Sequence, residues 1–134
     1  MHTIIPLFNA AKEIFELSPR LRAIQLDERI KLADLLTLIG HILDDTKNKY
    51  RMGEVTTVKS QQIILLSEEL YFRLALSIGA AHAQLLSRKL RDGFCKMQHR
   101  GVKVTPEQWL MLESTVGYLL EASSELGMSR AGND

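Results

Sequence analysis

Cysteine is nearly absent from this chain, with Cys95 alone among 134 residues. A single thiol excludes a disulfide framework within the chain and a metal site built from several cysteines. Long apolar runs are absent too: none approaches the roughly 20 residues that a membrane span requires, and no secretory signal opens the sequence. We therefore expect a cytoplasmic protein without a membrane partner.

The chain also lacks a large net charge of either sign. The chain carries 17 basic and 16 acidic residues, a formal net charge of +1, so no overall field draws it to nucleic acid or to a membrane surface. Its composition, 46% hydrophobic and 25% charged, is ordinary for a folded soluble protein and argues against disorder. With 134 residues and 15.2 kDa, the chain is expected to form one domain.

Proline is scarce, and its three positions are informative. Pro6, Pro19 and Pro106 each lie where a helix can begin or stop, and none interrupts a long apolar pattern. Alternation of apolar and polar residues at period two never persists, whereas apolar spacings of three and four residues recur throughout the chain. The sequence therefore predicts an all-α fold, an antiparallel helical bundle of about four principal helices.

The limits of the first helices follow from their capping signals. Ser18 and Pro19 begin a short turn, Asp27 caps the second principal helix, and Gly53 is its expected stop. The four principal helices are expected over residues 5–17, 27–53, 58–99 and 105–127.

The last helix has the best local start signal in the chain. Thr105 is placed as the N-cap, Pro106 as the first helical residue, and Gln108 completes a capping box. Gly127 is expected to end this helix. The chain is thereby divided into a single helical-bundle domain and a flexible C-terminal tail, residues 1–127 and 128–134.

The segment 58–99 is the most informative, because it contains no proline and no cluster of turn-forming residues. As one long central helix at 1.5 Å per residue, it would extend on the order of 60 Å. Its apolar residues mark two faces, which is typical of a central helix or of one that also contacts a second chain. A break near Gly79 would instead give two shorter helices. The two faces are Ile63, Leu66, Leu70, Leu74, Ala81 and Leu85, and Leu65, Phe72, Leu76, Ala83, Leu86 and Leu90.

Three of the expected helices carry a glycine near the middle, at Gly40, Gly79 and Gly117. An interior glycine costs about 0.8–1 kcal/mol relative to alanine, so a packing reason is expected. One hypothesis is a shared layer in which His41 and His82 flank a small cavity for a ligand or a metal. The favoured interpretation is close helix crossing with both histidines hydrogen-bonded at the bundle surface, and we expect no bound metal.

Residues that could perform catalysis do not form a recognisable constellation. Cys95 and His99 are four residues apart on one helical face, and Arg91 and Lys96 would favour the thiolate form of Cys95. The adjacent Phe94 is instead typical of an ordinary packed helix position. The chain has no phosphate-binding loop, no serine elbow and no zinc-ligand spacing. We therefore predict no catalytic residue, no enzymatic activity and no cofactor.

Charge is unevenly distributed along the chain although its total is small. Residues 88–103 contain six basic residues and one acid, whereas residues 104–134 contain five acids and one base. The favoured interpretation is structural, because basic residues complement the dipole at a helix C-terminus and can pair with the acidic last helix. The alternative is a surface that contacts phosphates of nucleic acid. Its residues would be Arg88, Lys89, Lys96, Arg100 and Lys103.

The two apolar faces of segment 58–99, together with the lack of a catalytic constellation, favour a protein–protein interaction module. We expect an adaptor or regulatory domain that binds a protein partner and forms a homo-oligomer. A small nucleic-acid-binding accessory protein that uses residues 88–103 is the alternative. Interfaces favour aromatic residues and arginine. The residues selected for helix packing or partner contact are Leu66, Leu70, Phe72 and Leu74, with Tyr71 and Arg73 at the rim.

Overall fold

The computed structural model describes residues 4–52, 57–97 and 104–132, which form six helices and contain no strand. The predicted all-α fold is therefore confirmed for this part of the chain. The helices are α1 (Ile4–Glu16), α2 (Ser18–Leu21), α3 (Leu26–Arg51), α4 (Thr57–Ile78), α5 (Ala80–Met97) and α6 (Pro106–Gly132).

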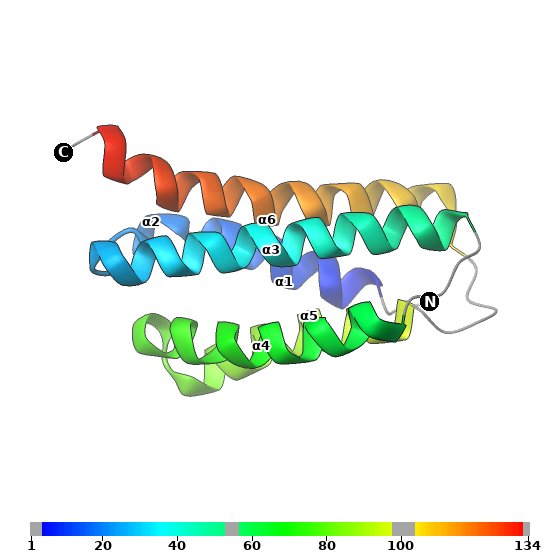
Figure 1. Cartoon of the computed structure of the whole chain (residues 1–134), viewed down its shortest axis with the longest axis horizontal. Helices are drawn as coiled ribbons and strands as arrows, with labels where there is room; N and C mark the ends of the chain where they lie inside the picture. Colours follow the sequence, from blue (N-terminus) through cyan, green and yellow to red (C-terminus); the bar gives the residue numbers. More distant parts are fainter. Residues whose placement is uncertain (1–3, 53–56, 98–103, 133–134) are drawn as a thin grey trace.

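Five of these helices form a closed ring in which each packs against the next. The order around the ring is α3, α6, α1, α5 and α4, which returns to α3, while the short α2 packs against α1 and α6. Figure 1 shows α3 and α6 side by side, with α4 and α5 as a separate pair below them. In the same view, α1 and α6 run in one direction, whereas the other neighbours in the ring are antiparallel. The structure thus does not confirm the expected bundle of four antiparallel helices.

The core fills the centre of the ring because each of the five helices turns one apolar side inward. Apolar residues three and four positions apart lie on the same side of a helix, so this spacing gives each helix one apolar side. Removing such a side chain, as in Leu→Ala, typically costs about 2–5 kcal/mol. Fully buried members are Leu7, Ile14, Leu36, Leu43, Leu70, Leu74, Leu86, Leu112 and Leu119.

The segment 58–99 is not one continuous helix, because α4 ends before Gly79 and α5 begins directly after it. Gly79 has φ +91°, a conformation that glycine adopts without the steric cost met by other residues. Its N–H donates to the carbonyl of Ala75 (3.1 Å), and its carbonyl accepts from the N–H of Ala83 (3.0 Å). The prediction of a long central helix is therefore wrong, and the alternative break near Gly79 is confirmed. The result is a tight helical hairpin, α4–α5.

A shared glycine layer is also not observed. A Cβ atom added to Gly40 of α3 would lie 2.9 Å from Leu120 Cδ2 of α6, so this glycine permits close packing of the two helices. A Cβ added to Gly79 or Gly117 would meet nothing within 4 Å. Close helix crossing thus explains Gly40, the turn explains Gly79, and nothing in the structure explains Gly117.

The start of α6 is as expected, whereas its end is not. The backbone N–H of Thr105 donates to Gln108 Oε1 (2.9 Å), and the N–H of Gln108 donates to Thr105 Oγ1 (3.2 Å). This pair of bonds is the predicted capping box. The helix continues beyond Gly127 to Gly132, so the predicted stop at Gly127 is wrong.

The starts of α2 and α3 lie within two residues of the expected positions. Leu17, not Ser18, is the N-cap of α2, and Gln25, not Asp27, is the N-cap of α3. Asp27 instead lies in the first turn of α3, where a carboxylate is favourable beside the positive end of the helix dipole. The expected stop at Gly53 lies outside the described residues. Among the helices described, none combines the length and apolarity needed to cross a bilayer.

Candidate functional site

Helix α4 has three sides with different surroundings. Leu70 and Leu74 face the core and are 0% exposed. Leu66 and Arg73 face α3, where they line a shallow groove of about 260 Å³ together with residues of that helix. Phe72 is 67% exposed and faces solvent. The residues selected from the sequence are therefore divided, and Leu70 and Leu74 serve packing within this chain.

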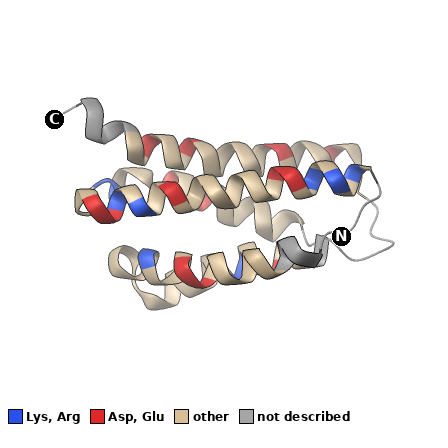
Figure 2. Cartoon of the chain, in the orientation of Figure 1, with Lys and Arg blue, Asp and Glu red and all other residues tan. Residues whose placement is uncertain are grey.

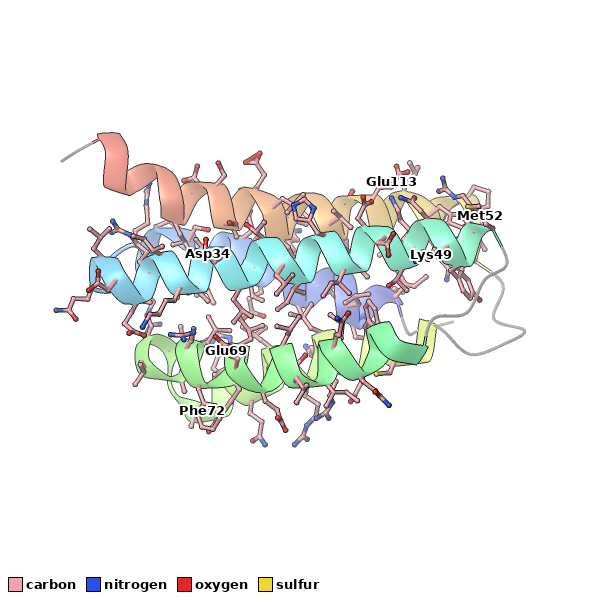
Figure 3. The ribbon with its side chains drawn as sticks, viewed as in Figure 1. Asp34, Lys49, Met52, Glu69, Phe72 and Glu113 are labelled. Carbon is pink, nitrogen blue, oxygen red and sulfur yellow. The ribbon has the colours of Figure 1, made fainter. Side chains whose placement is uncertain are left out.

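The solvent-facing side of α4 carries a line of large apolar side chains. Leu65, Phe72 and Leu76 are spaced by seven and four residues, which places them along one side of a helix. They are 67%, 67% and 79% exposed. Figure 3 shows Phe72 on the side of α4 that points away from α3 and α6. The sequence pattern assigned Leu65 and Leu76 to an apolar face but did not select them as contact residues.

A groove of about 360 Å³ lies between α4 and α5, beside this line of apolar residues. Its lining includes the buried Ser67 and Ser87, whose small side chains leave space where the two helices meet. Glu68 of α4 and Arg88 and Arg91 of α5 also line it, and Arg91 is hydrogen-bonded to Asp92, so α4 contributes a carboxylate to the groove and α5 contributes arginines. The exposed surface around it is called the hairpin face below; it comprises Leu65, Glu68, Phe72 and Leu76 of α4 with Leu85 and Arg88 of α5.

Tyr71 is half-buried at this groove and supports the exposed aromatic ring next to it. The ring of Tyr71 meets that of Phe72 edge-on, with the centroids 5.1 Å apart. Such a contact is favourable for aromatic pairs and restricts the positions that the rings can adopt. Phe72 is thus an exposed aromatic side chain held by a neighbour.

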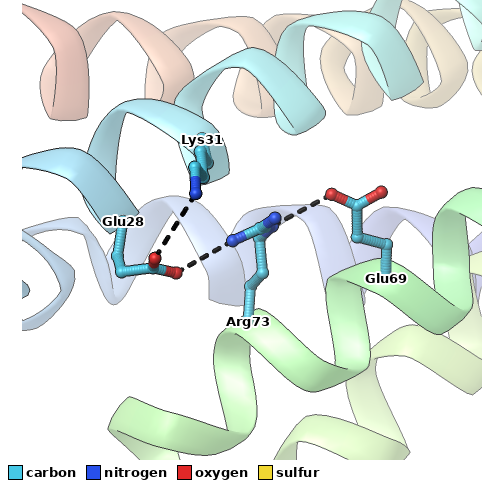
Figure 4. Close-up of polar contacts among 4 residues, drawn as sticks. All are labelled: Glu28, Lys31, Glu69 and Arg73. Carbon is cyan, nitrogen blue, oxygen red and sulfur yellow. Dashed lines mark hydrogen bonds and ion pairs between the residues drawn. The ribbon is translucent and has the colours of Figure 1, made fainter.

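Arg73 joins α4 to α3 within the chain. Its Nη1 donates to Glu28 Oε1 of α3 (2.9 Å), and its Nε donates to Glu69 Oε2 (3.0 Å). Lys31 Nζ lies 3.7 Å from Glu28 Oε2, so four charged side chains form one network (Figure 4). Because the Arg73 side chain is only 23% exposed and holds two carboxylates, its position is structural rather than that of a rim residue open to a partner.

The two histidines do not form a pair. His82 Nε2 of α5 bonds to Glu13 Oε2 of α1, between two neighbouring helices of the ring. His41 is exposed on α3. The favoured interpretation, a histidine hydrogen-bonded at the bundle surface, is therefore confirmed for His82. No group of three or more His, Cys, Asp or Glu side chains suited to a metal is found within the described residues.

Cys95 lies in an environment that opposes the thiolate form. Partial burial raises the pKa of the Cys95 thiol, the nearby Asp92 carboxylate raises it further, and Arg91 lowers it in part. The expectation that basic neighbours favour the thiolate is therefore wrong, because it omitted burial and Asp92. His99, the suggested partner of Cys95, lies outside the described residues.

The basic segment 88–103 is described only in part. Arg88 is exposed, Lys89 is half-buried, and Arg91 Nε donates to Asp92 Oδ1 (3.1 Å). The side chain of Lys96, and the whole of Arg100 and Lys103, lie outside the described part of the structure.

Two acidic residues of α6, Glu113 and Glu125, make ion pairs with other parts of the chain. Glu113 Oε2 lies 3.7 Å from Arg51 Nη2 and 4.0 Å from Lys47 Nζ, both on α3. Glu125 Oε1 lies 3.5 Å from Arg22 Nη1, which directly follows α2. Figure 2 shows the basic end of α3 beside α6, in agreement with these pairs. These carboxylates therefore connect α6 to α3 and to the residue that follows α2.

Comparisons with known protein families, with curated proteins and with solved structures give no match to this chain. The functional interpretation therefore rests on the described side chains. Among them, the hairpin face combines a line of exposed apolar residues, a held aromatic ring and a groove with a carboxylate on α4 and arginines on α5. Such a surface can bury apolar area against another protein and orient it through charge.

Proposed function

We propose that this chain is a non-enzymatic protein–protein interaction module, an adaptor or regulatory unit of the cytoplasm that also self-associates. The observation that carries the proposal is the line of Leu65, Phe72 and Leu76 exposed along α4. Single exposed apolar residues are normal on protein surfaces, whereas aligned ones that form a patch are typical of a contact site. The hairpin face is the docking surface in this proposal.

Burial of the apolar residues of this face contributes a free energy of the same order as the cost of association. Full burial of a leucine or phenylalanine side chain is worth about 1.5–3 kcal/mol. The three side chains are two-thirds or more exposed, so covering them would contribute about 3–6 kcal/mol from one surface. For comparison, a Kd of about 1 mM corresponds to about 4 kcal/mol. Two such surfaces in contact contribute twice as much, against an association cost of about 4–15 kcal/mol.

The proposal is tested by a matched pair of substitutions. Leu65→Glu places a charge on the hairpin face, whereas Leu110→Glu changes a leucine of similar exposure on α6, 64% against 67%. Sedimentation equilibrium over a range of concentrations should show self-association of the wild type and of Leu110→Glu, and its loss in Leu65→Glu. A wild-type chain that stays monomeric at every concentration would refute the self-associating part, and equal effects of both variants would refute the surface.

Binding of a different protein is tested with the same two variants. Each is used as bait in affinity capture from the native cell, with and without nuclease, followed by mass spectrometry. A partner that survives nuclease treatment, that Leu110→Glu retains and that Leu65→Glu loses is the expected result. Recovery that depends on intact nucleic acid would contradict this function.

A nucleic-acid-binding accessory function is the second candidate, based on the six basic residues in 88–103 and on the exposed side chain of Arg88. Glu68 and Asp92 lie beside Arg88 and Arg91, which reduces the positive charge of the described surface. If this candidate is correct, the chain should bind DNA or RNA at low salt and release it as salt increases. Lys96→Glu together with Arg100→Glu should then weaken the binding, and absence of binding at low salt would exclude it.

A further inference from the structure

We infer that the hairpin face receives a second copy of this chain, arranged so that α4 of each copy lies on α5 of the other. This inference rests on the proposed function and specifies one partner and its orientation. It depends on three features of the hairpin face: the placement of its two charges, the placement of its large and small residues, and its dimensions.

Glu68 and Arg88 of one copy can pair with Arg88 and Glu68 of a second copy. Glu68 of α4 lies eleven residues before the turn at Gly79 and Arg88 of α5 lies nine after it, so these two groove residues are within about 3 Å of the same height, on opposite helices. Arg91 also lines the groove, but its guanidinium is hydrogen-bonded to Asp92 of its own helix. A two-fold axis parallel to the hairpin places α4 of one copy against α5 of the other and keeps heights unchanged. Such an axis brings each Glu68 to the Arg88 of the other copy, and the contact therefore contains two identical ion pairs, as an isologous interface requires.

The apolar residues match in the same arrangement. Heights along the two helices are compared by counting residues from the turn at Gly79, at 1.5 Å per residue. Phe72 lies seven residues before the turn and Leu85 six after it, so the ring of one copy meets the leucine of the other. Leu76 lies three residues before the turn and Ala81 two after it, so a large exposed side chain meets a small one.

The opposite arrangement, with α4 on α4, is disfavoured by the same charges. Its two-fold axis runs across the hairpin and reverses heights about the centre of the contact. With the axis at Phe72, Glu68 lies against Leu76 of the other copy, and a carboxylate is desolvated without a partner. With the axis at Glu68, two carboxylates meet. The arrangement of α4 on α5 avoids both costs.

The hairpin face has the dimensions of a small stable interface. Helices α4 and α5 contain 22 and 18 residues, so the face is about 30 Å long and, with two helices of about 10 Å each, about 20 Å wide. Each copy thus offers about 600 Å², and the pair buries about 1,200 Å², the lower end of the range for specific interfaces. A dimer of moderate affinity is expected.

The experiment uses two single charge reversals, alone and mixed. Glu68→Arg and Arg88→Glu each replace both ion pairs of the dimer by repulsion, and each should weaken self-association by about tenfold or more in sedimentation equilibrium. In an equal mixture of the two variants, every contact between unlike chains again joins opposite charges. The mixture should therefore form a heterodimer with an affinity within about threefold of the wild-type dimer. Within each variant chain the two charges still repel, so only contact between chains explains this recovery.

Controls separate the arrangement from folding and from the proposed function. Glu121→Arg reverses an exposed charge on α6 and should leave the dimer unchanged, and circular dichroism should show the same helix content and melting for all variants. If the wild type dimerises and Leu65→Glu abolishes this, but the reversals have no effect or the mixture does not recover, the arrangement is refuted while the interaction surface stands. A wild type that is monomeric throughout refutes both the arrangement and self-association.

Discussion

Replacing Gly79 with alanine tests the feature that divides segment 58–99 into two helices. The position combines φ +91° with open space, since an added Cβ would meet nothing within 4 Å. The substitution therefore changes the backbone cost without creating a clash. Gly117 is a matched control, because it also has open space around an added Cβ but lies inside α6, and its φ is not positive.

The two substitutions should have opposite effects on stability. A residue with a side chain in the left-handed region costs about 1–2 kcal/mol, so Gly79→Ala should lower the free energy of unfolding by this amount. Alanine in a helix interior is about 0.8–1 kcal/mol better than glycine, so Gly117→Ala should raise it. The difference is about 2–3 kcal/mol, and at about 2.1 cal/mol/K per residue of unfolding entropy it corresponds to about 7–11 °C in Tm.

Thermal unfolding followed by circular dichroism at low protein concentration measures both variants against the wild type. Gly117→Ala should melt about 3 °C higher and Gly79→Ala about 4–7 °C lower. Sedimentation velocity should show the same shape for all three chains. A Gly79→Ala variant of unchanged shape that melts at or above the wild-type temperature would refute the positive φ at this turn.

Three further predictions follow from side-chain contacts. Gly40→Ala should lose about 1 kcal/mol in chemical denaturation because overpacking against Leu120 exceeds the gain in helix propensity; an equal loss in a Leu120→Ala background would contradict that contact. A double-mutant cycle of Arg73→Ala and Glu28→Ala should give a coupling of about 0.5–1 kcal/mol, since the pair is partly exposed; zero coupling would show that the pair does not hold α4 to α3. Because the folded chain raises the pKa of Cys95, the unfolded thiol ionises first, so stability should fall as pH rises through its ordinary value of 9.0. The Cys95→Ser variant should lack this part of the pH dependence, and rapid alkylation of folded Cys95 at pH 8 would argue against the raised pKa.

Local sequence signals identified the helices well where the relevant interactions are local. The capping box of Thr105 and Gln108 forms as predicted, because its two hydrogen bonds connect residues three positions apart. By contrast, the predicted stop at Gly127 failed, since a glycine inside a helix costs only about 1 kcal/mol and α6 continues to Gly132.

The candidate site was identified only in part for a related reason. Leu65, Leu70, Phe72 and Leu74 are all apolar and all lie on one helix, and spacing alone does not say which of them face the core. In the structure Leu70 and Leu74 are buried, whereas Leu65 and Phe72 are exposed. The rotation of α4 about its own axis, relative to α3 and α5, decides which of these residues face the core. This rotation depends on contacts between residues far apart in the chain.

The helices of the described chain, and the absence of strands there, follow from apolar spacing. A helix satisfies its own backbone hydrogen bonds, and its period appears in the sequence as apolar residues three and four positions apart. The hairpin at Gly79 does not follow from that pattern. Both a continuous helix and two helices joined by Gly79 agree with the local spacing, and they differ in what covers the second apolar face. Packing of α4 and α5 against each other and against α1 and α3 selects the hairpin. The same packing leaves Leu65, Phe72 and Leu76 exposed, because no other helix in the described chain reaches that side of α4.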